Sequence, residues 1–358
     1  MDVALIRQQF PVFSVPSLEG AVFFDGAAGT QMCSRALEAS VRASIENNAN
    51  LGGHFSTSII AEQDLDRARS AAAALLNASC AQEIVFGQNM TALTFHMSRC
   101  IGRSLRKGDE IVLTRSDHEA NISPWLELAK DLELTVRWLP FDFETYGFDL
   151  SQAASLITER TRVVALSYAN NVTGTINDVA AVAALARNMG AIVYVDAVQY
   201  APHGVIDVQA LGCDLLACSS HKLYGPHQGV LWGRLALLEQ LIAYKPRPTL
   251  DKPPYKFETG TKSREAIAGV GGAIEHLAWI GRTLGGSPVN GSQRNQIVSG
   301  MHAVIAHEQR LVQEVLAGLE ALDEVKIYGL CKPHDLQCRV PTPVSYTHLR
   351  AHETKANL

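Results

Sequence analysis

The 358-residue chain has no long hydrophobic run and no strong excess of charge of either sign. No stretch approaches the roughly 20 apolar residues that a membrane-spanning helix needs. Residues 1–13 carry Asp2 and Arg7 and lack the apolar core of a secretory signal. The net charge of −5 gives no electrostatic reason to expect nucleic acid or an anionic membrane as a partner. We therefore expect a cytoplasmic protein without nucleic-acid or membrane partners.

A disulfide framework is not expected either. The cysteines number seven, which is odd, and they follow no repeating pattern. In a chain of this length they predict reduced thiols. The sequence also contains no internal repeat and no low-complexity segment. Apolar residues, in contrast, make up 47% of the chain, so that it can bury a sizeable core. The length fits one large domain and a smaller one.

Short β-rich runs alternate with Ala- and Leu-rich stretches over most of the chain. The expected strands are residues 22–25, 83–87, 110–114, 135–139, 163–168, 191–196, 215–219 and 230–233. Several are continuously apolar, as expected of strands buried on both faces. Helices are expected at 59–77, 91–105 and 178–189, the last followed by Gly190 as a C-terminal cap. This alternation predicts an α/β fold, a three-layer sandwich with a mainly parallel sheet.

The remaining segments suggest a division into domains. A proline-rich stretch at 244–255 predicts an irregular surface excursion. Beyond it we expect a long helix from about residue 293 to 322 and strands at 325–328 and 339–344. The predicted parts are an N-terminal arm at 1–20, a large domain at 21–284 and a smaller, incomplete α+β C-terminal domain at 285–344.

The last 14 residues, 345–358, break from the preceding sequence. They resemble a translated sequencing-library adapter, and we interpret them as a non-native tail. His348 and His352 are four residues apart, the spacing of a helical metal pair, but we predict no metal site there or elsewhere in the chain.

Two candidate functional side chains stand at the ends of apolar runs. Lys222 follows one run directly and precedes a Gly-Pro turn, and Asp196 closes another at its carboxyl end. Open α/β sheets bind ligands at that edge. Pyridoxal 5′-phosphate (PLP) requires both groups, an amine to form a Schiff base and a carboxylate to keep the pyridine nitrogen protonated. Taken singly, Lys222 also fits an exposed loop lysine, and Asp196 fits a capping or turn aspartate.

Six motifs occur in order between residues 23 and 261. They are FDGAA at 24–28, DHEANISPW at 117–125, NNVTG at 170–174, VDAVQ at 195–199, SSHKLYGP at 219–226 and FETGT at 257–261. Together they resemble the class V aminotransferase family, and most closely its cysteine desulfurase-like branch. The resemblance implies fold type I of the PLP-dependent transferases and a PLP-dependent reaction on an amino acid.

The resemblance also implies the roles of individual residues. Lys222 would hold PLP as a Schiff base and carry the proton at the substrate α-carbon, Asp196 would pair with the pyridine nitrogen, and His118 would stack on the ring. These three are the expected catalytic residues. Further cofactor contacts are expected from Gln199 and Asn171 near the ring oxygen O3′, and from Thr91, Ser219, His221 and the partner subunit's Thr261 at the phosphate. The shared phosphate site makes a homodimer the expected state.

The reaction outcome depends on residues around the substrate. A cysteine desulfurase also needs a cysteine that accepts sulfur and an arginine that clamps the substrate carboxylate. The resemblance places both in a C-terminal region that we expect to be missing, because the native-looking sequence ends near residue 344. None of the seven cysteines matches the sulfur-accepting position.

We expect a cysteine desulfurase-like C–S lyase or sulfurtransferase that forms an external aldimine by displacing Lys222 and passes sulfur to an acceptor protein. Several alternatives stay open. They are an aminotransferase, an epimerase, a selenocysteine lyase-type reaction, and a PLP-binding protein with impaired catalysis.

Overall fold

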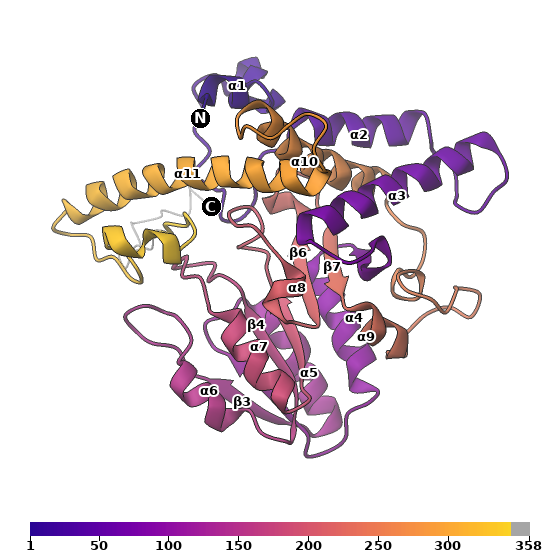
Figure 1. Cartoon of the computed structure of the whole chain (residues 1–358), viewed down its shortest axis with the longest axis vertical. Helices are drawn as coiled ribbons and strands as arrows, with labels where there is room; N and C mark the ends of the chain where they lie inside the picture. The colour runs from indigo at the N-terminus through magenta and orange to yellow at the C-terminus, as the bar shows by residue number, and fades with distance from the viewer. Residues whose placement is uncertain (345–358) are drawn as a thin grey trace, which may run out of the picture.

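The structure is a computed structural model that describes residues 1–344 (Figure 1). The expected adapter-like tail at 345–358, with His348 and His352, lies outside the described residues.

A seven-stranded sheet in the order β1-β7-β6-β5-β4-β2-β3 forms the centre of the molecule. The strands are β1 (Ile84–Gly87), β2 (Glu110–Thr114), β3 (Thr135–Leu139), β4 (Thr161–Ser167), β5 (Ile192–Asp196), β6 (Leu215–Ser219) and β7 (Gly229–Gly233). Strand β7 is antiparallel to both β1 and β6, and every other neighbouring pair is parallel. The prediction of an α/β fold with a mainly parallel sheet is confirmed.

Helices cover both faces of the sheet. Within residues 1–344 the helices are α1 (Val3–Arg7), α2 (Ser34–Ile45), α3 (Ser56–Leu76), α4 (Met90–Gly102), α5 (Ser123–Leu132), α6 (Leu150–Leu156), α7 (Val179–Asn188), α8 (Val208–Leu211), α9 (Leu235–Gln240), α10 (Arg264–Thr283) and α11 (Gln293–Glu320). Helices α7 and α8 lie on one side of the strands, and α4 and α5 lie on the other (Figure 1).

Two apolar cores result, because successive side chains of a strand point to opposite faces. In β5, Val193 and Val195 join the core beneath α3, α7 and α10, whereas Tyr194 joins the core beneath α4, α5 and α9. Tyr194 and Trp125 are both fully buried there and meet edge to face at 5.4 Å. Burial on both faces explains why the strands read as continuously apolar runs.

The predicted strand at 22–25 is wrong. These residues form no strand, and Phe24 is 96% exposed. The chain is held to the rest of the protein a few residues later, where Thr30 N–H donates to the His221 carbonyl at 2.9 Å. An apolar run forms a strand only where a neighbouring strand provides backbone groups for hydrogen bonding, and residues 22–25 have no such neighbour within residues 1–344.

The C-terminal part agrees with the prediction in its helix and departs from it in its strands. Helix α11 matches the expected helix and packs against α10 and α3. Residues 325–328 form no strand, and in place of a strand at 339–344 there is an isolated bridge between Arg339 and Thr175. The domain boundary between residues 284 and 285 falls in the connection from α10 to α11 and stays a prediction.

No helix within residues 1–344 is both long and apolar enough to cross a membrane.

Candidate active site

The carboxyl ends of the parallel strands β2, β4, β5 and β6 meet at one edge of the sheet. Asp196 ends β5, and Lys222 ends a short 3₁₀ turn, η5 (Ser220–Lys222), that follows β6 directly. The Lys222 Nζ donates to Gln199 Oε1 at 2.9 Å. Lys222 and Asp196 are also close enough for each charge to affect the pKa of the other. The structure therefore brings the predicted amine, carboxylate and amide together.

Burial shifts the pKa values of both Asp196 and Lys222. Asp196 is 6% exposed, and its Oδ1 accepts from Val198 N–H at 2.9 Å. Burial raises the pKa of the Asp196 carboxyl to about 6, against the opposing effects of that hydrogen bond and of Lys222. Burial lowers the pKa of the Lys222 amine, and Asp196 and Asp25 partly compensate. A lysine with a lowered pKa is more often neutral, which is the form that attacks a carbonyl group.

The start of α4 lies beside the end of β6. The Ser219 Oγ accepts from Met90 N–H at 3.2 Å, and Thr91 is the next residue of the helix, with an exposed side chain. The Asn89 side chain caps the helix by accepting from Ala92 N–H at 2.8 Å. A helix N-terminus with nearby hydroxyl groups suits a phosphate. The structure thus brings Ser219 and Thr91 together where the sequence predicted a phosphate contact.

His221 precedes Lys222 and is half-buried. Its ring stacks on His227 at a centroid distance of 5.1 Å and an angle of 8°. Burial, with help from His227 and Lys222, lowers the pKa of His221 and favours the neutral ring. Its carbonyl accepts from both the N–H and the hydroxyl of Thr30, which connects the segment just after the FDGAA motif to the turn that contains Lys222.

His118 lies just beyond β2 and is exposed. Its Nδ1 accepts from Ala120 N–H at 3.0 Å and so caps the turn η4 (Glu119–Asn121). This hydrogen bond assigns the hydrogen of a neutral ring to Nε2. The ring is therefore anchored at one nitrogen, while its exposed side remains available to a ligand.

Asp117 is an acidic residue beside the site that sequence reasoning did not assign. Its carboxylate accepts from Thr114 Oγ1 and Ser167 Oγ, each at 2.7 Å, and from Asn121 Nδ2 at 2.9 Å. Ser167 pairs with Asp196 across β4 and β5. Burial raises the pKa of Asp117 to about 6, and Asp196 contributes to the rise. The signal was present in the sequence, since Asp117 directly precedes His118.

Asn171 and Thr261 have fewer contacts. Asn171 is half-buried in the turn after β4, where the neighbouring Asn170 Oδ1 accepts from the backbone of Val172 and Thr173 at 2.8 and 2.9 Å. Thr261 is exposed, and within residues 1–344 no hydrogen bond joins its side chain to the other predicted site residues.

The FETGT motif that contains Thr261 is anchored through Glu258. The buried Glu258 carboxylate binds the guanidinium of Arg69 in α3 at 2.8 and 3.1 Å. It also accepts from Phe86 N–H in β1 at 2.8 Å. This pairing fixes the motif to the main body while leaving Thr261 at the surface.

Thr342 is a second residue that sequence reasoning missed. Its Oγ1 accepts from Gln199 Nε2 at 2.7 Å, across 143 positions of the chain. No local pattern marks this residue, because the contact depends on the path of the C-terminal segment.

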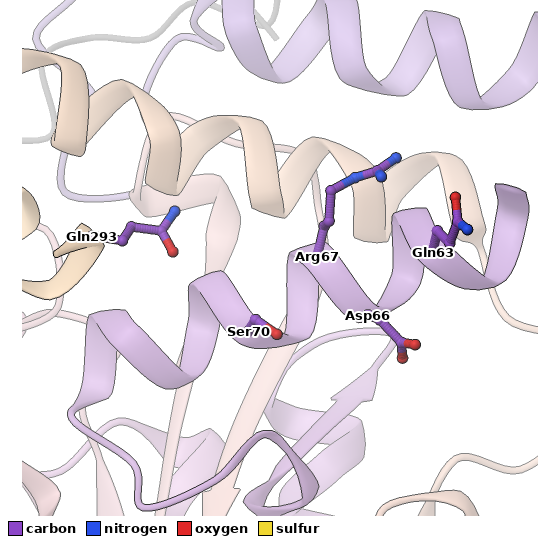
Figure 2. A pocket seen from close by; sticks show the side chains of 5 residues that line it. All are labelled: Gln63, Asp66, Arg67, Ser70 and Gln293. Atoms are coloured by element: carbon purple, nitrogen blue, oxygen red, sulfur yellow. The ribbon is translucent and has the colours of Figure 1, made fainter. Parts of the chain in front are cut away.

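Figure 2 shows a hollow beside α3 whose lining includes none of the side chains described above. It is lined by Gln63, Asp66, Arg67, Ser70 and Gln293. Four of these come from one helix and are exposed, and none is a predicted site residue. The hollow offers no buried polar group that would hold a ligand.

Metal-ligating side chains do not cluster in the described part of the chain. Within residues 1–344 no group of three or more His, Cys, Asp or Glu side chains is arranged to hold a metal ion.

Comparison with known proteins matches residues 22–284 to the family model described as "Aminotransferase class-V". The chain is 34% identical to an aminotransferase-like protein of Gibberella zeae, over 96% of this chain and 81% of that protein. It is 35% identical to a probable cysteine desulfurase of Pseudomonas aeruginosa, over 90% of this chain and 79% of that protein.

Solved structures agree. A cysteine desulfurase from Thermococcus onnurineus matches with a TM-score of 0.80 and 26% identity, covering 94% of this chain and 80% of that one. A cysteine desulfurase from Escherichia coli matches with a TM-score of 0.73 and 28% identity, covering 90% of this chain and 78% of that one. Enzymes of this family typically use PLP. The family match covers the whole sheet and the site at its edge, and the chain belongs to the class-V aminotransferase family.

Proposed function

We propose that this protein is a PLP-dependent enzyme that acts on an amino acid, as a cysteine desulfurase-like C–S lyase. The observation that carries the proposal is the Lys222 amine, which binds Gln199 at 2.9 Å beside the buried Asp196. The names of the relatives, probable cysteine desulfurase and cysteine desulfurase, support the choice of reaction.

The residues present fit PLP in each of its parts. Lys222 supplies the amine for covalent attachment, and Asp196 supplies the carboxylate for the pyridine nitrogen. The N-terminus of α4, with Thr91 and Ser219, supplies donors for the phosphate. When bound, PLP supplies an electron sink that stabilises negative charge at the α-carbon of an amino acid.

The side chains then have separate tasks. Lys222 takes a proton from the substrate α-carbon and returns it, because burial keeps the pKa of its amine below the usual value. Asp196 holds a proton at the pyridine nitrogen, and its buried position excludes water from that contact. His118, anchored through Nδ1, covers one face of the site.

A second candidate, transamination, has its own support in the 34% identity to the aminotransferase-like protein. The cysteines do not decide between the two reactions. Cys33, Cys100, Cys213 and Cys218 are buried, and burial raises the pKa of each thiol, which makes these four poor nucleophiles. Cys80 and Cys331 are partly exposed, however, and Cys338 is exposed.

The proposal includes a homodimer and a sulfur-acceptor protein. Exposed apolar side chains between residues 22 and 60 support the homodimer, with Phe24 at 96% and Ile45 at 76% exposure. Thr261, exposed and outside its own site, would reach the phosphate of the partner subunit. Sedimentation of the purified protein at micromolar concentration tests this, and a monomer would contradict it.

One assay separates the reactions. The purified protein is loaded with PLP and incubated with L-cysteine, and sulfide and alanine are measured. The incubation is then repeated with other amino acids and an α-keto acid acceptor. Sulfide with alanine supports the desulfurase-like reaction, and keto-acid exchange supports transamination. A yellow protein that forms neither product would contradict both, leaving a cofactor-binding protein with impaired catalysis.

A further inference from the structure

We infer that Thr342 is a positioning residue that holds the Gln199 amide with its carbonyl oxygen toward Lys222. The inference rests on the proposed function for the meaning of Lys222, but the contact itself stands on geometry. Gln199 links the two residues, since its Nε2 donates to Thr342 Oγ1 at 2.7 Å and its Oε1 accepts from Lys222 Nζ at 2.9 Å.

The Gln199 amide is buried, so each end of it must face a protein group that can form its hydrogen bond. Gln199 is 4% exposed and Thr342 is 2% exposed. A primary amide has one end that accepts and one that donates. If the amide turned over, its NH₂ group would face the Lys222 ammonium, and two donors would meet. The hydroxyl of Thr342 opposes this by giving the NH₂ group a fixed acceptor on the far side.

Thr342 is itself held by a buried arginine. The guanidinium of Arg339, 7% exposed, donates to the carbonyl of Leu330 at 2.6 Å and to that of Thr342 at 3.4 Å. Each of its hydrogen bonds within residues 1–344 goes to a backbone carbonyl. Arg339 therefore stabilises the backbone conformation of residues 339–342.

The same segment is attached to the turn after β4. Ile176 N–H donates to the Cys338 carbonyl at 2.9 Å, and Val340 N–H donates to the Gly174 carbonyl at 2.8 Å. Gly174 has φ +78°, and a Cβ there would lie 2.6 Å from the Val340 carbonyl oxygen. Only glycine permits this approach. A continuous set of contacts thus runs from the C-terminal segment through Thr342 and Gln199 to Lys222.

The reactivity of Lys222 in the cofactor-free protein tests the inference. A carbonyl that accepts from the ammonium stabilises the charged amine, so losing it raises the neutral, reactive fraction at a given pH. Asp196, Asp25 and His221 also act on this amine, and they remain in every variant. Trace labelling with acetic anhydride near neutral pH, quantified on the Lys222 peptide by mass spectrometry, measures the reactive fraction.

Thr342→Val should increase Lys222 labelling about fivefold, the equilibrium factor of one net hydrogen bond. Thr342→Ser restores the hydroxyl and should label at the wild-type rate. Thr161→Val is the matched control, because Thr161 is also buried and its hydroxyl accepts from Thr158 N–H at the amino end of β4, away from Gln199 and from residues 339–342. It too should label at the wild-type rate.

Arg339→Lys is a second perturbation for the case in which Thr342→Val does not fold. It keeps the charge, weakens the hold on Thr342 and should change labelling in the same direction. Equal labelling in the wild type and in every folded variant, or an equal increase in Thr161→Val, overturns the inference. Loading each protein with PLP distinguishes a failure of this inference from a failure of the proposed function. If the wild type forms no chromophore that depends on Lys222, the proposed function fails, whereas labelling still decides the role of Thr342.

Discussion

Replacing Asp196 by asparagine should stabilise the cofactor-free protein while removing the carboxylate of the proposed site. Burial raises the pKa of Asp196 from 3.8 to about 6. A carboxyl with a raised folded-state pKa destabilises the fold as pH rises from the unfolded-state value through the folded-state value. A rise of about two units, at about 1.4 kcal/mol per unit, corresponds to about 3 kcal/mol above pH 6. The asparagine Oδ1 can still accept from Val198 N–H.

Urea unfolding of the cofactor-free protein at several pH values measures this effect. At pH 8 the free energy of unfolding of Asp196→Asn should exceed that of the wild type by about 2–3 kcal/mol, and at pH 4 the two should converge. Asp251→Asn is the control, since the side chain of Asp251 is 78% exposed. A variant that is no more stable than the wild type at pH 8 would refute the claim that burial raises the pKa of the Asp196 carboxyl and destabilises the folded protein.

Lys222→Ala should abolish the visible chromophore formed with PLP, and mass spectrometry after borohydride reduction should find no cofactor on another lysine. Glu258→Ala should destabilise the fold by about 3–5 kcal/mol, because it leaves the buried Arg69 charge unpaired. Urea unfolding measures this loss, and a loss below about 1 kcal/mol would show that water reaches the guanidinium. Ser219→Ala should weaken PLP binding by about three- to tenfold in equilibrium titration, since it removes the hydroxyl at the end of β6 that lies beside the start of α4. Unchanged affinity would place the phosphate elsewhere.

Most of the α/β framework was predictable because its signals are local. The strands β2, β3 and β6 have the predicted bounds. Polar residues border β2 and β6, and Pro140 follows the last residue of β3. Helix α7 ends where Gly190 adopts φ +73°, as its position after the helical pattern indicated. In these segments the apolar pattern of the sequence matches the side chains that the folded element buries.

The unpredicted features depend on neighbours that are distant in sequence. The apolar run at 22–25 has strand composition, but no strand lies beside it to pair with its backbone. The orientation of β7, antiparallel to β1 and β6, leaves no mark on its own five residues. The segment at 339–344 differs from these cases, because its own Pro341 and Pro343 have no N–H to donate to a neighbouring strand, and it forms a single bridge rather than a strand.

The sequence by itself determined the family resemblance and the candidates Lys222, Asp196 and His118, because these side chains stand in ordered motifs at the ends of apolar runs. Their roles remain predictions. Tertiary structure alone decided that the Lys222 amine would meet Gln199, that Asp117 would lie beside Asp196, and that Thr342 would reach the site from 143 positions away. The physical reason is that a motif specifies which side chains a strand end presents, whereas protonation and orientation depend on burial and on hydrogen-bond partners supplied by the folded chain.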